Sequence, residues 1–270
     1  MRLQATAAST LLALLLTSSA ALSDTSEQAI SVGGTTNLAP ILAKAASEYQ
    51  ATHAGTVIAV KGTSSGAGIA SLKSRKIDVA MSDVAVSDPD FSDTVIGVVG
   101  FAFVVAPDVG VTNLTRQDAI GILSGTITNW KQLGGEDHKI VLIGRDIGTG
   151  TRFVVETKIA QTMVPTQIER NATAVVAAVA ATPGSIGYIA SGFIGSHQNL
   201  VITYNGIAPT EENIRSHRYE ISTDEHLYTW KGANPSIGAF VDYVKSDSAL
   251  LSAHGVFQPE SQVLGVGNQR

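Results

Sequence analysis

The sequence predicts an α/β protein whose β-sheets are mostly parallel, and three observations support this prediction. Short apolar runs of strand length alternate with stretches of helical periodicity along most of the chain. Alanine, glycine and valine are abundant while aromatic residues make up only 6% of the sequence, which suits tight turns between strands and helices. The 270 residues are 44% hydrophobic, which excludes a disordered chain and is enough for one large domain or two lobes of roughly 100–130 residues each.

The predicted strands are short apolar runs, several of which end at glycine, serine or aspartate. The run at residues 95–105 is almost continuously apolar, as expected of a strand that is buried on both faces. Strands are expected at residues 29–32, 56–60, 77–81, 95–105, 140–143 and 186–189.

The predicted helices are recognised by apolar residues three or four positions apart. Thr115 is the expected N-cap of one helix, with Asp118 in its first turn, and Pro183-Gly184 ends another. Helices are expected at residues 38–49, from 69 onward, at 115–123, through 153–158, at 172–180 and at 237–244.

Residues 1–23 have the pattern of an export signal. Arg2 provides a positive start, the run at 11–16 is LLALLL, and small residues follow, so that cleavage after Ala21 or Ser23 is expected. The apolar run is too short to span a bilayer stably. The alternative is a buried helix of the fold. Without this segment the chain has 17 basic and 23 acidic residues, a formal charge of −6, and we expect an exported, periplasmic or secreted protein.

Composition also argues against several kinds of partner and cofactor. The whole chain has 18 basic and 23 acidic residues and no basic stripe, so nucleic acid and anionic membrane surfaces are poor candidates. The absence of cysteine excludes disulfides, thiolate metal sites and thiol nucleophiles. The six histidines have no metal-ligand spacing and no nucleotide-binding glycine motif is present, so we expect no metal and no cofactor.

Three loops share one chemistry, since each carries glycine with serine or threonine between a predicted strand and a predicted helix. They lie at 33–36, 62–66 and 148–151, and Arg145 precedes the third. Free N–H groups, the positive end of the helix dipole and hydroxyl donors together favour an anion. A single such loop is more often an ordinary helix cap, but three loops and an arginine indicate a shared oxyanion site.

The second loop allows a different reading as a hydrolase. GTSSG at 62–66 matches the G-x-S-x-G nucleophile elbow, for which Asp83 or Asp146 and His254 could complete a triad. The elbow leaves the other two loops unexplained.

The chain resembles the periplasmic phosphate-binding proteins of ABC importers, over nearly all of its length after the leader. The motifs that carry the resemblance are GGTTNLAP at 33–40, KGTSSGAGIASL at 61–72, DVAMSD at 78–83, ILSGTITNWKQLGG at 122–135, GRDIGTGTRF at 144–153, PGSIGYI at 183–189 and HLYTWKG at 226–232. The resemblance implies two α/β lobes, each a mostly parallel sheet flanked by helices, with the ligand in the cleft between them. It implies lobe 1 at 24–104 and 221–270, lobe 2 at 105–220, and hinges near 103–107 and 218–222.

The resemblance also implies a set of ligand-binding residues. The family's contacts fall on Thr36 through its hydroxyl and Asn37 through its backbone N–H, and on residues of the other loops: Ser64, Ser65, Asp83, Arg145, Thr149, Gly150 and Thr151. One position departs from the family pattern, because Ile147 stands where an acidic residue commonly follows the arginine. This departure leaves open whether phosphate, arsenate or another oxyanion is preferred.

The function implied is capture of inorganic phosphate and its delivery to the membrane subunits of an ABC permease, by a monomer without enzymatic turnover. One alternative is a secreted phosphatase on the same fold, with Ser64 or Thr149 in a catalytic role. Another is a phosphate sensor or surface protein that serves no importer.

Overall fold

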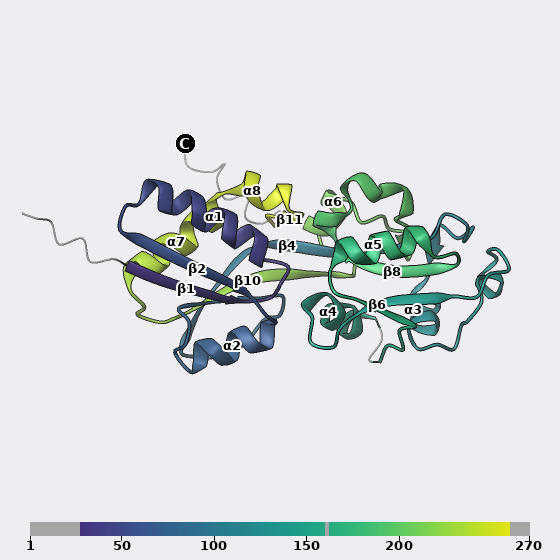
Figure 1. Cartoon of the computed structure of the whole chain (residues 1–270), viewed down its shortest axis with the longest axis horizontal. Helices are drawn as coiled ribbons and strands as arrows, with labels where there is room; N and C mark the ends of the chain where they lie inside the picture. The colour runs from purple at the N-terminus through teal and green to yellow at the C-terminus, as the bar shows by residue number, and fades with distance from the viewer. Residues whose placement is uncertain (1–27, 160–161, 260–270) are drawn as a thin grey trace, which may run out of the picture.

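The computed structural model describes residues 28–159 and 162–259, so the predicted leader at 1–23 lies outside the described residues. Two α/β lobes lie side by side, joined by long strands that pass from one to the other (Figure 1). The joining strands are β4 (Phe91–Val105) and β10 (Ser222–Trp230). The strand order β2-β1-β3-β10-β4-β8-β6-β7 therefore runs through both lobes.

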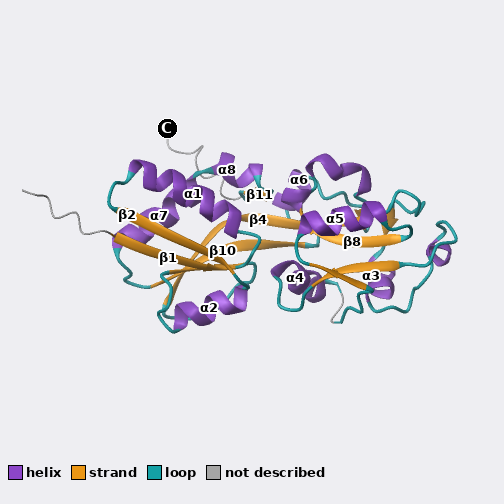
Figure 2. Cartoon of the chain, viewed as in Figure 1, coloured by secondary structure: helices purple, strands orange, loops and turns teal. Residues whose placement is uncertain are grey.

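The lobe that contains the start of the described chain has a parallel core sheet with helices on both faces (Figure 2). Its strands are β1 (Gln28–Gly34), β2 (Thr56–Gly62), β3 (Val79–Ser82) and the short β11 (Val256–Phe257). One face packs on α1 (Ala39–Thr52), α7 (Pro235–Ser246) and α8 (Ser248–Ala253), and the other on α2 (Ser65–Lys73). Val79 and Met81 belong to the first core and Ala80 to the second, which is the alternation of a strand buried on both faces.

The second lobe repeats this plan. Its parallel strands are β8 (Ser185–Ala190), β6 (Val141–Arg145) and β7 (Gln167–Glu169). The helices are α3 (Arg116–Leu123), α4 (Gly150–Lys158), α5 (Ala172–Ala181) and α6 (Glu211–Arg215). Short elements complete it: β5 (Asn113–Leu114), β9 (Thr203–Tyr204) and the 3₁₀ turns η1 (Trp130–Leu133), η2 (Ser191–Phe193) and η3 (Gly195–Leu200).

The predicted α/β class is confirmed, with one refinement in the strand directions. The strands β1, β2 and β3 of one lobe, and β6, β7 and β8 of the other, pair in parallel. The pairs β4–β10, β10–β3, β4–β8 and β4–β11 are antiparallel. The expected strand at 95–105 is the buried part of β4, and the expected cap at Thr115 forms a full capping box with Asp118. The strand expected at 77–81 begins and ends slightly later, at Val79–Ser82.

The strand β10 has no counterpart among the predicted elements. Its first half, Ser222 to His226, is polar or charged, so it lacks the apolar run that identifies a strand. Its ladder partners β3 and β4 hold it on both sides, and this pairing outweighs the weak local preference.

The packing of α2 against β1 depends on a glycine. At Gly68, an added Cβ would lie 2.7 Å from Gly34 Cα and 2.8 Å from the Gly33 carbonyl oxygen. These are backbone atoms that cannot turn aside, so the helix would have to move away from the sheet.

We expect Gly68→Ala to lower the free energy of unfolding by about 1–3 kcal/mol, the usual cost of overpacking. Gly66→Ala is the matched control, because nothing lies within 4 Å of a Cβ at Gly66 of the same helix. That variant should be neutral or gain up to about 1 kcal/mol from helix propensity. Urea unfolding of both variants measures the difference, and equal stabilities would contradict the close approach.

Candidate functional site

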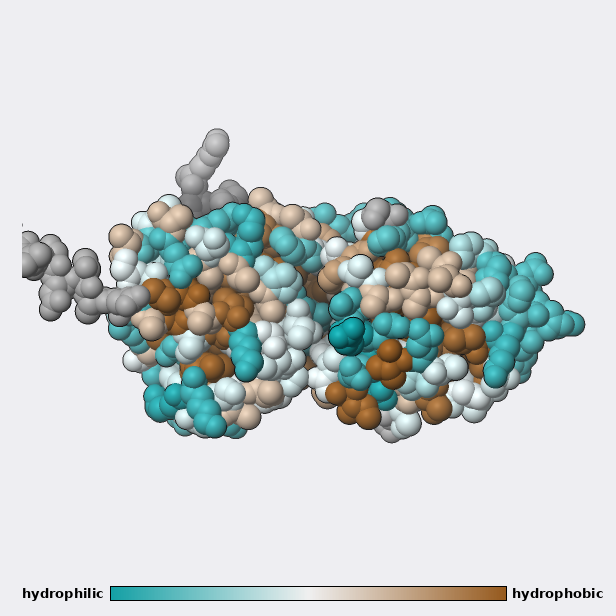
Figure 3. Space-filling view, in the orientation of Figure 1, coloured by the Kyte–Doolittle hydropathy of each residue, from teal (hydrophilic) through white to brown (hydrophobic). Residues whose placement is uncertain are grey.

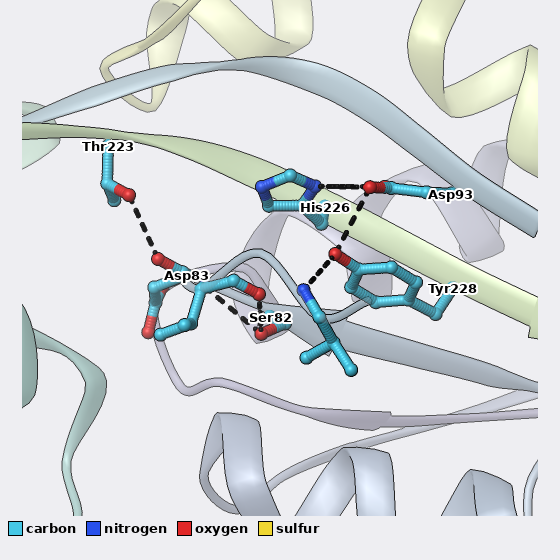
Figure 4. A network of polar contacts seen from close by, with 8 residues as sticks. Ser82, Asp83, Asp93, Thr223, His226 and Tyr228 are labelled. Atoms are coloured by element: carbon cyan, nitrogen blue, oxygen red, sulfur yellow. Dashed lines mark hydrogen bonds and ion pairs between the residues drawn. The ribbon is translucent and has the colours of Figure 1, made fainter. Parts of the chain in front are cut away.

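The candidate site lies where the carboxyl ends of β1 and β3 face the loop between β6 and α4 of the other lobe. In open α/β sheets, ligands bind at such strand ends. Asp83 directly follows β3 and is 1% exposed, so its carboxylate lies inside the protein and not on a surface turn. Its backbone carbonyl accepts a hydrogen bond from the Thr223 hydroxyl of β10 at 3.1 Å (Figure 4).

Three side chains of the same lobe donate hydrogen bonds to the Asp83 carboxylate. The Thr35 and Ser65 hydroxyls donate to Oδ2 at 2.7 and 3.1 Å. The Asn37 amide donates to Oδ1 at 3.1 Å. Ser65 Oγ in turn accepts the backbone N–H of Asp83 at 3.1 Å. A carboxyl that accepts from three donors is best satisfied in its ionised form.

A second buried carboxyl lies next to Asp83. Strand register pairs His226 with Ser82, which places Glu225 opposite Asp83 at a bulge of β10. Glu225 is 0% exposed, and apart from the neighbouring Asp83 carboxyl no group of the described residues forms a hydrogen bond with its carboxyl oxygens.

The two carboxyls have different protonation states. Burial, and then the neighbouring charge of Asp83, raise the pKa of Glu225 well above its usual value. Burial also raises the pKa of Asp83, but the hydrogen bonds that it accepts oppose this rise. Two adjacent buried carboxylates repel each other strongly, so one proton stays on the pair. We place it on Glu225, because Asp83 holds the donors.

The second lobe touches this cluster through the first residues of α4. Gly150 lies directly against Asp83, and a Cβ on Gly150 would overlap the carboxylate. The Thr151 hydroxyl donates to Asn37 Oδ1 across the lobes at 3.2 Å. Glycine is therefore required at position 150 for this approach of the lobes.

Arg145 ends β6 and carries a buried positive charge. Its side chain is largely covered, with the residue 5% exposed; Nη2 donates to the Arg170 carbonyl at 3.0 Å, and Nε has no partner among the described residues. In the described part of the chain no carboxylate forms an ion pair with it, whereas its neighbour Arg152 pairs with Glu156 at 2.8 Å. Burial lowers the pKa of Arg145, because the charged form lacks solvent. A guanidinium in this state suits an incoming anion.

The structure brings together five of the nine residues expected to bind ligand, namely Asn37, Ser65, Asp83, Gly150 and Thr151. Arg145 ends β6, just before the loop that leads to Gly150, and among the described residues its side chain hydrogen-bonds the Arg170 carbonyl and none of these five residues.

The other three expected residues have different local roles. Thr36 is exposed, Ser64 caps α2 by accepting from the Ala67 N–H at 3.2 Å, and the Thr149 hydroxyl donates to the Asp146 carbonyl at 2.9 Å. The Asn37 N–H, expected to meet the ligand, donates to Thr35 Oγ1 at 3.2 Å.

Two residues of the cluster, Thr35 and Glu225, were not expected from the sequence. Thr35 could have been found from the sequence, because it lies in the first of the three loops that combine glycine with serine or threonine. No sequence pattern identifies Glu225, since it lies in a polar stretch whose partner strands are known only from the fold.

A cavity of about 340 Å³ opens beside the cluster, between α2 and α4. Figure 3 shows the indentation between the two lobes. Within residues 28–159 and 162–259, no three histidine, aspartate or glutamate side chains converge to hold a metal ion, and no helix is long and apolar enough to cross a membrane.

Comparison with known proteins places the chain among binding proteins. Residues 18–248 match the family model described as PBP superfamily domain. The phosphate-binding protein PstS of Bacillus subtilis is 28% identical over 231 residues, covering 83% of this chain and 77% of that protein. PstS of Borreliella burgdorferi is 28% identical over 240 residues, covering 82% and 86%. The crystal structure of an ABC-type phosphate transport receptor from Vibrio cholerae superposes with a TM-score of 0.77 at 30% identity, covering 85% of this chain and all of that one.

We expect Glu225→Gln to change how stability depends on pH. The raised pKa of Glu225 means that the folded protein binds its proton more tightly than the unfolded chain does. The wild type therefore loses stability as the pH rises from the usual glutamate range through the raised pKa, while the amide variant does not. The wild type and Glu225→Gln should have similar melting temperatures near pH 4. At pH 9 the free energy of unfolding of Glu225→Gln should exceed that of the wild type by at least about 1 kcal/mol, which raises its melting temperature by about 2–4 °C. Parallel melting curves from pH 4 to 9 would contradict a neutral, buried Glu225.

Proposed function

Because the chain belongs to the PBP superfamily and, within it, to the ABC-type phosphate transport receptors, we propose that it captures inorganic phosphate between its lobes and delivers it to an ABC permease. The observation that carries the proposal is a pair of buried, oppositely charged groups at strand ends on either side of the contact between the lobes, since Arg145 ends β6 and Asp83 follows β3. The second lobe contributes Arg145, a buried cation without a counter-ion, and the first lobe contributes Asp83, a buried acceptor.

This pairing suits an anion that still carries a proton. Phosphate keeps at least one proton near neutral pH and can donate it to Asp83 while its other oxygens accept from Arg145 and the loop hydroxyls. Sulfate has no proton to donate, so its oxygens would face the carboxylate directly. An unpaired or repelling buried contact of this kind costs several kcal/mol and selects phosphate over sulfate.

Binding is proposed to join the two lobes. We divide the chain into lobe 1 at 24–104 and 221–270 and lobe 2 at 105–220, with hinges near 103–107 and 218–222. The two-lobe arrangement is supported by β4, which pairs with β10 over residues 91–100 and with β8 of the other lobe over residues 101–105 (Figure 1). Residues of both lobes would then contact one anion: Thr36, Asn37, Ser64, Ser65, Asp83, Arg145, Thr149, Gly150 and Thr151. We propose that the protein acts as an exported monomer.

The hydrolase alternative has less support from the described residues. Ser64 accepts a helix-capping bond, and His254, which follows α8, contacts the Leu250 carbonyl of that helix through Nδ1 at 2.9 Å. Neither group has the neighbour that a nucleophile and its base require. We therefore propose binding without turnover.

Titration calorimetry with phosphate, arsenate, sulfate and molybdate tests the proposed function. We expect phosphate to bind at one site per chain and sulfate to bind far more weakly. No heat with phosphate, or equal affinities for phosphate and sulfate, would count against the proposal.

We expect Arg145→Ala to lose roughly 2–5 kcal/mol of phosphate binding, at least about 30-fold in Kd, since it removes the charge-assisted contact. Arg116→Ala is the matched control, because Arg116 is a half-exposed arginine whose nearest acid is Glu220 at 3.9 Å. That control should change Kd by less than about twofold. If Arg145→Ala stays within about threefold of the wild type, the anion binds elsewhere.

We expect Asp83→Asn to reduce the preference for phosphate over sulfate by at least about tenfold, or about 1.4 kcal/mol. The amide can donate to an unprotonated oxyanion and no longer repels it. Because at least one of the donors Thr35, Asn37 and Ser65 then loses its acceptor, stability should also fall by about 1–3 kcal/mol. Competition titrations on both proteins measure the ratio, and an unchanged ratio would assign the selectivity to another residue, with Asp146 the next candidate.

A further inference from the structure

The cleft has more room than a tetrahedral oxyanion needs. Its cavity of about 340 Å³ falls at the lower end of the roughly 300–1,000 Å³ that is typical of sites for small organic ligands. The lining residues come from both lobes: Ser64, Ser65, Gly66, Ile69, Ser82, Val84, Val86, Gly148, Gly150 and Phe153.

The wall of this cavity changes chemistry along its length. Ser65 and Gly150, at the starts of α2 and α4, belong to the polar cluster around Asp83. One turn further along the same helix faces lie Ile69 and Phe153, which line the cavity as well. Phe153 is 46% exposed although it is a large aromatic side chain. An apolar compartment therefore adjoins the proposed oxyanion site.

The compartment lies next to contacts between the two lobes. The lobes already meet where Gly150 lies against Asp83 and where Thr151 bonds to Asn37 at 3.2 Å. The cavity remains open beside these contacts.

The apolar wall on the first lobe is held in place by hydrogen bonds. The Ser82 hydroxyl donates to the Val84 carbonyl at 2.8 Å, and the Val86 N–H donates to the Tyr228 hydroxyl at 2.8 Å. Tyr228 in turn donates to Asp93 at 3.2 Å, and Asp93 also contacts His226 at 2.9 Å (Figure 4). Val84 and Val86 are thus positioned in advance, which lowers the entropy cost of packing a ligand on them.

We propose that this cleft also binds a phosphoryl anion that carries a small apolar organic group, as in a phosphonate or a phosphate monoester. The oxyanion occupies the site at Asp83 and Arg145, and the organic group packs on Phe153, Val84 and Val86. Such an anion keeps one proton in mildly acidic solution and can donate it to Asp83, as inorganic phosphate does. This inference rests on the proposed function, because the two ligands share the oxyanion site.

Calorimetry at pH 6 on the full-length protein tests the proposal with phenylphosphonate, whose C–P bond resists hydrolysis. We expect phenylphosphonate to bind with a Kd within about 30-fold of that of inorganic phosphate and to compete with it for one site. Benzenesulfonate has the same ring but no proton to donate, and should not compete.

The variant Phe153→Ala separates the organic group from the oxyanion. It should weaken phenylphosphonate binding about tenfold, or about 1.4 kcal/mol, and leave inorganic phosphate within about twofold. Phe193→Ala is the matched control, since Phe193 is 41% exposed and does not line the cavity. Its affinities for both ligands should match those of the wild type.

Three results would overturn the inference. If phosphate binds but phenylphosphonate does not compete at 1,000-fold excess, on the order of 4 kcal/mol, the inference fails and the proposed function stands. If Phe153→Ala weakens both ligands equally, the ring supports lobe closure and does not contact the organic group. If inorganic phosphate itself does not bind, the proposed function fails and this inference fails with it.

Discussion

The burial of the Asp83 carboxylate is the constraint on which the site depends. A carboxylate at 1% exposure is tolerated only when donors replace the water that it loses. Thr35 and Asn37 supply donors from the loop after β1, and Ser65 supplies one from the start of α2. The same carboxylate limits the other lobe, because only glycine at position 150 can approach it so closely. The residues of three segments, the loop after β1 and the starts of α2 and α4, are thus constrained by one charge.

The neighbouring Glu225 must stay protonated while Asp83 is ionised. The only hydrogen-bond partner of its carboxyl among residues 28–159 and 162–259 is Asp83, and ionising Glu225 would place a second negative charge beside that carboxylate. With the proton on Glu225, the first lobe carries one negative charge at Asp83 and the second lobe one positive charge at Arg145. A protonated oxyanion matches this arrangement, since it offers a donor to the first and acceptors to the second.

Much of this arrangement could be predicted from the sequence, but the exact partners could not. Local patterns predicted the alternation of strands and helices and the three glycine and hydroxyl loops, because these depend on residues close together in the chain. Within the first loop the sequence indicated Thr36, yet Thr35 is the residue that turns inward to Asp83. Glu225 lies opposite Asp83 only because β10 pairs with β3 and bulges between Glu225 and His226. Register and bulges between distant segments leave no local pattern.

The contact between Asp83 and Gly150 also bears on how ligand binding and lobe closure are coupled. Gly150 begins α4, so the carboxylate meets the positive end of that helix dipole when the lobes come together. This attraction favours contact between the lobes even without an anion, and the Thr151–Asn37 bond adds to it. A ligand that displaces these contacts binds with net affinity only if its own contacts with the two lobes contribute more free energy than the displaced ones. In the proposed complex, the anion donates to Asp83 and accepts from Arg145, so that bonds to full charges on both lobes replace the dipole contact. The acceptor on one lobe and the cation on the other are then both satisfied by a single ligand.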